Sequence, residues 1–436
     1  MADPRIEAVK FLIKIEKDKS YSALSLGDGL RGLSFSDSRD VSFAVNLVYG
    51  VLEHKITLDY NISLYLTSPI KKLRPEVLNI IRVGAYQILY MDKIPVSAAV
   101  NEAVKASKKL KSAYASGMIN AVLRKIAENG LTLPDINSDK LNYYSVLYSV
   151  SADLVKQLIN DYGYEATDNI MAAFCGRRPI YIRCNSLKCT PDELISGLEA
   201  EGVKASLTSL DGCIEVEATG DISKLNAYKK GLFHVQDMSS QLCCRLLDAH
   251  NDDFIIDCCA APGGKSFTIA QYMNNSGKLI SCDMYEHKTK LISDGSVRLG
   301  ISNLSTVCSD ARRLKESFSG ADKVLCDVPC SGFGVMGRKP EIRYKSSDEL
   351  KSLPLIQKEI LYSCAEMVKA GGTLIYSTCT LNRKENDDIC DDFLLDFPDF
   401  RISDDELYSS FTERYITLFP DNNGGDGFFI AKFIRG

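Results

Sequence analysis

Two cysteines each follow an apolar stretch typical of a β-strand, in surroundings that favour chemistry over packing. Cys330 lies in KVLCDVPCSG and Cys379 in GTLIYSTCTL. Because the thiolate form of cysteine is a nucleophile, two thiols at neighbouring strand ends beside an acid suggest covalent chemistry on an electrophilic ligand. Other cysteines fall within predicted strands and are expected to face the core: Cys258, Cys282, Cys308 and Cys326.

A glycine turn follows the predicted strand FIIDCCA and opens a predicted helix. Small residues at such a turn let a ligand approach the backbone, and the start of the helix offers unpaired N–H groups to an anion. The turn lacks both the GxGxxG pattern of dinucleotide folds and the Walker spacing of a P-loop, so by itself it indicates a ligand only weakly. The candidate cofactor residues are Cys259, Ala260, Ala261, Pro262, Gly263, Gly264 and Lys265.

Three aspartates stand at the ends of the next three predicted strands: Asp283, Asp310 and Asp327. An acid that ends the second strand is placed to accept both ribose hydroxyls of a nucleoside cofactor, and one after the third strand can accept from an adenine amino group. Each aspartate alone is equally consistent with an exposed strand end. All three together with the glycine turn favour a cofactor site.

The elements that must position these residues alternate between short apolar strands and helices from Phe254 onward. This pattern predicts a parallel, doubly wound α/β sheet with ligands at the carboxyl ends of its strands. The final stretch FFIAKFIR is expected to close the sheet as an antiparallel strand. The expected parallel strands lie within residues 254–260, 278–283, 304–309, 323–329 and 372–379.

Two other patterns precede the α/β part. Apolar residues recur at helical spacing from Arg5 to about Asn129, which predicts an all-α domain. Residues 178–235 alternate short β-runs with one amphipathic helix and predict a small α+β subdomain, separated from the helices by the polar, turn-rich stretch 131–140. We therefore divide the chain into 1–130, 131–235 and 236–436.

Charge is distributed unevenly over the 436 residues, whose net charge is −5. Residues 1–130 hold 19 lysines and arginines against 13 acids, or +6, and the remainder holds 33 against 44, or −11. A run without acids from Val104 to Ala127 is consistent with a solvated helix face or with an RNA-phosphate contact surface. The acidic run 385–406 is interpreted as a solvated helix face and the loop after it. The cations of the acid-free run are Lys105, Lys108, Lys109, Lys111, Arg124 and Lys125.

Composition argues against a membrane, secreted, disulfide-bonded or metal-binding protein. No apolar run is long enough to cross a bilayer, and the first residues lack the pattern of a signal peptide, so we expect a cytoplasmic protein without membrane contact. The 15 cysteines are expected to stay reduced. With 4 histidines and no CxxC pair, we expect no metal.

The motifs CCAAPGGKS, DVPCSGFGVMGRKPEIRY and YSTCTLNRKEND resemble those of the RNA 5-methylcytosine methyltransferases. The layout is similar to the bacterial RsmB (Sun, Fmu) family of 16S ribosomal RNA methyltransferases over nearly the whole chain. The resemblance implies an all-α NusB-like RNA-binding domain, a small α+β (RRM-like) subdomain and a Rossmann-like class I methyltransferase domain that uses S-adenosylmethionine. It implies 16S ribosomal RNA as the partner, with cytosine 967 as the family's usual target. No obligate protein partner is evident.

The resemblance also implies individual roles. It assigns the cofactor to the turn from Cys259 to Lys265, the ribose to Asp283, the adenine to Asp310 and the catalytic edge to Asp327. Cys379 corresponds to the nucleophile that adds to the cytosine, and Cys330 to the cysteine that assists release.

The chain departs from the family at two places. Gly337 stands where a basic residue is usual, which could remove one phosphate contact. Phe333 replaces a smaller residue and could alter how the base is shelved.

Three alternatives remain open at this point. One is a 5-methylcytosine methyltransferase that acts on tRNA. Another is a NusB-like RNA-binding protein with an inactive methyltransferase fold, which predicts the loss of one of the two cysteines. A third is an enzyme of the same fold that methylates an exocyclic amine, but the DVPC sequence argues against it.

Overall fold

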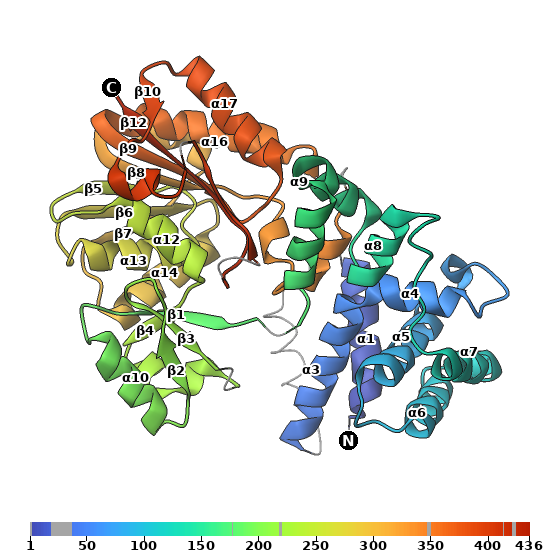
Figure 1. Cartoon of the computed structure of the whole chain (residues 1–436). Coiled ribbons are helices and arrows are strands. Elements are labelled where there is room, and N and C mark those ends of the chain that lie inside the picture. Colours follow the sequence, from blue (N-terminus) through green and yellow to red (C-terminus); the bar gives the residue numbers. More distant parts are fainter. Residues whose placement is uncertain are drawn as a thin grey trace. The chain divides into compact units, whose positions relative to one another are not determined.

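The computed structural model describes residues 2–18, 37–176, 178–217, 220–346, 350–412, 414–420 and 424–436. The chain forms two compact units (Figure 1). The first comprises Met1–Asn160 and Lys339–Ser346, and the second comprises Asp161–Arg338 and Ser347–Gly436. A short segment downstream of Cys330 thus belongs to the first unit, although the chain on either side of it belongs to the second.

The first unit is helical, as its periodicity predicts. Its core contains Leu47, Ile81 and Leu123, all inaccessible to solvent. Pro75 occupies the first turn of its helix, where a missing N–H is tolerated. The α-helices are α1 (Pro4–Asp18), α3 (Ser38–Glu53), α4 (Lys55–Ser63), α5 (Pro75–Tyr90), α6 (Val96–Lys109), α7 (Ser116–Asn129) and α8 (Lys140–Tyr148), with 3₁₀ turns η1 (Ile70–Lys72), η2 (Ala113–Ala115) and η6 (Pro340–Tyr344).

A longer helix, α9 (Ala152–Ala173), leads to the small subdomain and is interrupted at Gly163, whose φ of 78° is not helical. The subdomain is a four-stranded antiparallel sheet in the order β2-β3-β1-β4, so the predicted α+β subdomain is confirmed. Its first helix starts with a capping box between Thr190 and Glu193. The elements are β1 (Ile180–Cys184), α10 (Pro191–Ala200), β2 (Ala205–Leu207), β3 (Cys213–Val216), η3 (Ile222–Lys224), α11 (Asn226–Lys229) and β4 (Phe233–Val235).

The rest of the second unit is built on a larger sheet in the order β10-β12-β9-β8-β5-β6-β7, with β11 paired to β12 (Figure 1). Strands β5 to β9 pair in parallel, as predicted. The last strand joins the sheet antiparallel, as predicted, and its partner is β9. The strands are β5 (Phe254–Asp257), β6 (Lys278–Asp283), β7 (Leu304–Cys308), β8 (Ala321–Asp327), β9 (Val368–Thr378), β10 (Phe400–Ile402), β11 (Ile416–Leu418) and β12 (Phe428–Arg435).

Helices cover both faces of this sheet, because alternate strand residues enter two separate cores. Ile256 and Val324 belong to one core, together with residues of α16, and Ile255 and Leu325 belong to the other, together with residues of α12 and α13. The sheet is therefore doubly wound. The helical elements are α12 (Met238–Leu247), α13 (Gly264–Tyr272), α14 (Glu286–Leu299), η4 (Ala311–Glu316), η5 (Phe333–Val335), α16 (Leu353–Met367), η7 (Arg383–Glu385), α17 (Asp387–Asp396) and α18 (Glu406–Ser409).

The predicted core cysteines divide into two groups. Cys258, Cys282 and Cys326 are buried, as expected. The prediction for Cys308 is wrong, because this thiol is exposed at the end of β7. The strand β7 is the last in the order of the sheet, and among the described residues only β6 pairs with it.

Within the described ranges, no helix combines the length and the apolar character needed to cross a membrane.

Candidate active site

The glycine turn connects β5 to α13 at the carboxyl edge of the parallel strands. Gly263 caps the helix with a φ of 110°, a conformation that side chains rarely adopt. A Cβ on Gly263 would lie 2.4 Å from the ring of Phe267, so the turn requires glycine for steric reasons as well. The predicted turn is thus present, with the N–H groups of the first turn of α13 at this edge.

Two hollows adjoin at the turn and share Cys259 as a lining residue. The first has a volume of about 820 Å³, part of it open to solvent, and is lined by Asp283 and Asp310 among others. The second brings the turn and the end of β8 together; its lining includes Ala260, Ala261, Pro262, Gly264, Lys265 and Asp327. The structure therefore gathers the three predicted aspartates around the predicted turn. The backbone of Gly263 belongs to the same turn.

The two aspartates of the larger hollow differ in their surroundings. Asp283 is nearly buried at the end of β6, and its Oδ1 lies 3.5 Å from Lys288 Nζ. Asp310 pairs with Arg312 at 2.6 Å. Hydrogen bonds from Arg312 lower the pKa of Asp310, which stays ionised. Both side chains are acceptors, and this is the chemistry that ribose hydroxyls and an adenine amino group require.

An ion pair joins the turn to the end of β8. Lys265 Nζ lies 2.8 Å from Asp327 Oδ2, and Ser377 donates to Asp327 Oδ1 at 2.8 Å. Burial works against the charged form of Lys265, but the neighbouring Asp327 carboxylate outweighs burial and raises the pKa of the lysine. Asp327 thus carries a fixed negative charge with a defined orientation next to the turn.

The two candidate cysteines meet at this edge. Cys330 follows β8 and Cys379 follows β9, and their Sγ atoms are 3.2 Å apart, without a disulfide. The hydrogen bond with Cys379, together with burial and the charges of Cys379, Glu385 and Asp327, raises the pKa of the Cys330 thiol well above its ordinary value. The Cys330 thiol is therefore protonated at neutral pH.

A fourth acid, Asp257, lies at the end of β5 and was not among the predicted site residues. It is fully buried, lines the second hollow and accepts from Ser266 at 2.6 Å. Burial raises the pKa of Asp257 to about 7, with the Asp327 charge acting in the same direction. Its position as the last strand residue before the glycine turn was the signal that could have identified it.

The acidic run 385–406 contains a residue whose predicted exposure to solvent differs from the structure. Asp388 and Asp392 are exposed on α17, as expected, but Glu385 is fully buried. The interpretation as a solvated face is therefore wrong for Glu385, because this side chain accepts hydrogen bonds from three buried or half-buried groups.

The two departures from the family pattern have structural explanations. Phe333 is buried in the core, so its ring does not line the cleft. Beside Gly337, a Cβ would lie 3.1 Å from Nε of Arg178, so a cation from another segment stands next to this glycine. The neighbouring Arg338 pairs with Asp426 at 2.8 Å and with Asp237 at 3.1 Å.

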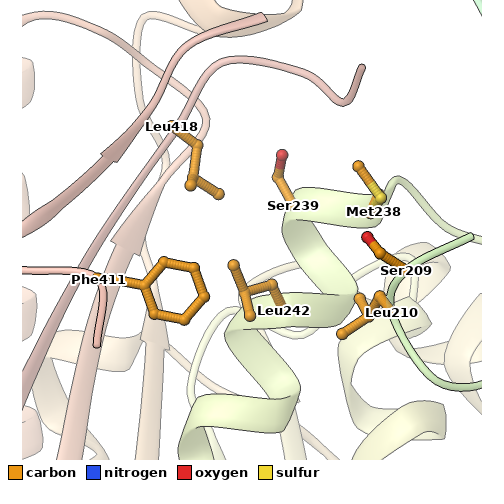
Figure 2. A pocket seen from close by; sticks show the side chains of 7 residues that line it. All are labelled: Ser209, Leu210, Met238, Ser239, Leu242, Phe411 and Leu418. Carbon is orange, nitrogen blue, oxygen red and sulfur yellow. The ribbon is translucent and has the colours of Figure 1, made fainter. Parts of the chain in front are cut away.

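A further hollow, separate from these residues, is mainly apolar. Figure 2 shows Leu242, Phe411 and Leu418 directed toward it, with the hydroxyls of Ser209 and Ser239 as its polar groups. Its lining contains no ionisable side chain, so neither hydroxyl has a base in the lining to activate it as a nucleophile.

On the first unit, the predicted basic run is exposed but partly paired. Lys105 lies 2.7 Å from Glu102 and Lys109 lies 3.3 Å from Asp3, and these lysine side chains are more than half exposed. Surface pairs of this kind are weak and exchange readily with solvent ions. The exposed run therefore remains compatible with both of its interpretations.

The fold and the site together define a class of protein. A doubly wound sheet with a glycine turn after β5, acids at its strand ends and two thiols at adjacent strand ends is the arrangement of a Rossmann-like α/β domain, and its strand-end acceptors are of the type that a nucleoside cofactor requires.

Comparisons with known proteins identify the family. The profile described as "16S rRNA methyltransferase RsmB/F" matches residues 244–434, the "NusB family" matches 2–128, and a RsmF/B-like ferredoxin-like domain matches 152–223. A "Probable ribosomal RNA small subunit methyltransferase B" of Bacillus subtilis (strain 168) is 36% identical, and the match covers 98% of this chain and 97% of the relative. A "Ribosomal RNA small subunit methyltransferase B" of Vibrio vulnificus is 28% identical, over 91% and 92%.

Solved structures share the fold. The crystal structure of PH0851 matches with a TM-score of 0.83 at 24% identity, over 99% of both chains. A methyltransferase homolog protein from Pyrococcus horikoshii matches with a TM-score of 0.60 at 25% identity, over 68% of this chain and 99% of that one. The chain therefore belongs to the RsmB family of 16S ribosomal RNA methyltransferases and carries an N-terminal NusB domain. The cofactor of this methyltransferase family is S-adenosylmethionine, as predicted.

Proposed function

We propose that this chain methylates carbon 5 of a cytosine in 16S ribosomal RNA, with cytosine 967, the family's usual target, as the expected position. The observation that carries the proposal is the 3.2 Å separation of the Cys330 and Cys379 sulfurs, next to the Lys265–Asp327 pair. Methylation of an exocyclic amine requires no nucleophilic thiol, whereas carbon 5 of cytosine requires one, because the ring must first be activated by addition.

The residues of the two hollows fit the cofactor. S-adenosylmethionine supplies an electrophilic methyl group when it is bound. We assign its ribose hydroxyls to Asp283 and its adenine amino group to Asp310, since both side chains are acceptors that line the larger hollow. The turn Cys259–Lys265 contributes backbone N–H groups, which suit a carboxylate.

Cys379 is the proposed nucleophile. Its thiolate adds to carbon 6 of the cytosine, a sulfur–carbon bond forms, and the ring becomes an enamine that is nucleophilic at carbon 5. Asp327 is assigned to ring nitrogen 3 or to the exocyclic amine, where a carboxylate held by Lys265 and Ser377 has little freedom to reorient.

Cys330 is proposed to assist release. Once Cys379 is bound to carbon 6, its hydrogen bond to Cys330 and its charge are both lost, and these are among the causes that raise the pKa of Cys330. Cys330 then loses its proton to solvent and takes the carbon 5 proton of the methylated ring. The bond between Cys379 and carbon 6 breaks, and the starting state returns with the proton on Cys330.

The target base must leave its stack unless it already lies in a loop. We assign the holding of the RNA backbone to the basic first unit, through phosphate contacts that carry little sequence information. This assignment explains why a long helical domain precedes the α/β domain.

Two measurements test the proposal. Total RNA is methylated with labelled cofactor and the product base is mapped: carbon 5 of a 16S cytosine is expected, and label on tRNA instead would favour the alternative substrate. Cys379→Ala should abolish turnover while calorimetry shows intact cofactor binding. Residual activity within about tenfold of wild type, or about 1.4 kcal/mol in barrier, would contradict the nucleophile assignment.

A further inference from the structure

Glu385 is a buried carboxylate that the proposed chemistry does not use directly. It belongs to η7, shortly after Cys379, and its side chain is inaccessible to solvent. Its Oε2 accepts from the backbone N–H of Ser331 at 2.9 Å and from Gln357 Nε2 at 2.8 Å. Its Oε1 accepts from Asn382 Nδ2 at 2.7 Å. One side chain thus connects the loop after β8, helix α16 and the loop after β9.

These donors are neutral amides, and no lysine, arginine or histidine in the described part of the chain forms an ion pair with Glu385. A buried carboxylate without a cation is unfavourable unless its hydrogen bonds are well made. Three hydrogen-bond donors point at this side chain, so the position requires a group that only accepts. An ionised carboxylate meets this requirement. No cation among the described residues pairs with this charge. The charge therefore acts on the pKa of the titratable groups nearby.

A second set of hydrogen bonds connects the same two loops. The hydroxyls of Ser331 and Thr380 are 2.6 Å apart. Thr378 donates to Asn386 Oδ1 at 2.7 Å, and Asn386 Nδ2 donates to the carbonyl of Thr380 at 3.0 Å. Ser331 directly follows Cys330, and the two threonines flank Cys379. A buried polar network that includes Glu385 therefore joins the two loops that carry the cysteines.

We propose that Glu385 is a positioning residue that joins the two cysteine loops and makes the thiols unequal, so that the shared proton stays on Cys330 and the thiolate forms on Cys379. The role that this difference between the thiols plays in catalysis rests on the proposed function, but the difference in proton affinity itself does not. The residue acts through the two sulfurs and not on the substrate.

The charged groups around the two thiols favour a proton on Cys330. Cys330 faces Cys379 on the loop after β9, Glu385 on η7 and Asp327 at the end of β8, and each of these raises the pKa of Cys330. The charge of Asp327 is offset by Lys265 on α13, at 2.8 Å. No cation in the described part of the chain pairs with Glu385 in this way, so Glu385 is the acid whose removal should change the thiol pair most.

Alkylation measures where the thiolate lies, without RNA and without turnover. The full chain is treated with iodoacetamide between about pH 6 and pH 9, and labelled peptides are quantified by mass spectrometry, since the thiolate is the form that reacts. Exposed Cys308 serves as the internal reference for reagent access. In wild type, Cys379 should be labelled before Cys330.

Three variants separate charge from shape. Glu385→Gln keeps the size, removes the charge and replaces one acceptor oxygen by a donor. It should lower the Cys379-to-Cys330 labelling ratio by about tenfold and move the pH midpoint of Cys330 labelling downward, because the pKa of Cys330 then loses one of the causes that raise it. Glu385→Asp keeps the charge and should keep Cys379 as the preferred site. Asp388→Asn, an acid-to-amide change at an exposed position of the same segment, should behave as wild type.

Earlier labelling of Cys330 in the wild-type chain would overturn the proposal, and so would a Glu385→Gln ratio equal to that of wild type. If Glu385→Gln fails to fold, as judged by circular dichroism, the order in which the two cysteines are labelled in wild type and in Glu385→Asp still tests the proposal. Failure of the proposed function is seen separately, as methylation that survives Cys379→Ala whatever the labelling ratio.

Discussion

Replacing Lys265 by methionine should destabilise the second unit by removing the cation from a largely buried ion pair. The side chains of Lys265 and Asp327 are 14% and 25% exposed, and the pair distance is 2.8 Å. Methionine retains most of the apolar length of lysine, so the packing of the stem changes little. The Asp327 carboxylate would remain beside Asp257 without its cation.

Breaking a buried pair by removing one partner destabilises by about 3–5 kcal/mol. We expect the lower end, about 3 kcal/mol, because Asp327 is partly solvated and keeps its hydrogen bond from Ser377. For a unit of this size, that loss corresponds to a fall of roughly 6–12 °C in the melting temperature.

Calorimetry and denaturant unfolding of the full chain measure the effect. Lys290→Met is the matched control, because Lys290 and Asp294 form a 3.1 Å pair with side chains that are 73% and 61% exposed. That change should stay within about 0.5 kcal/mol of wild type. Adding Asp327→Asn to Lys265→Met should restore part of the loss, since the stranded charge is then gone. A Lys265→Met variant as stable as the control would refute the reasoning.

Three further outcomes are expected. Cys330→Ala should accumulate a covalent protein–RNA band on a denaturing gel, because release is slowed more than addition; a band in Cys379→Ala instead would reverse the two roles. Burial raises the pKa of Asp257 to about 7, so its stabilising contribution is present at low pH and is lost as the pH rises through the folded value. Between about pH 4 and pH 7, the unfolding free energy of wild type should fall relative to Asp257→Asn by up to about 1.4 kcal/mol per pH unit, and parallel curves would contradict this. Neutralising four exposed lysines together should weaken RNA binding and flatten its dependence on salt over roughly 50 to 200 mM, with cofactor affinity unchanged, whereas equal affinity at all salt concentrations would exclude phosphate contacts. These lysines are Lys105, Lys108, Lys109 and Lys111.

Much of the fold could be predicted because its signals are local. Helical spacing predicted the helical character of the N-terminal part of the chain, and Pro75 marked the start of α5. Alternation of apolar strands and helices identified the doubly wound sheet, and the final apolar run indicated a closing antiparallel strand, although not that its partner is β9. Each of these patterns reports which side of one element faces a core, and that depends on neighbours within a few residues.

The errors came from residues whose local pattern was misleading. Cys308 has the sequence context of a core residue, but its strand lies at the sheet edge. Glu385 stands in a run of acids that is otherwise largely exposed, but three donors from separate elements surround it. In both cases, exposure depends on which elements lie adjacent in space.

The amino-acid sequence by itself determined the elements, the glycine turn and the residue types at the strand ends. Only the tertiary structure decided which of these groups meet. Cys330 and Cys379 are 49 residues apart in the chain, and Lys265 and Asp327 are 62 apart, yet each pair is in contact. The physical reason is the strand order: β8 lies between β5 and β9, so parallel pairing brings the carboxyl ends of these three strands to one edge. Local spacing contains no information on that order, because strand pairing depends on contacts between segments that are distant in sequence.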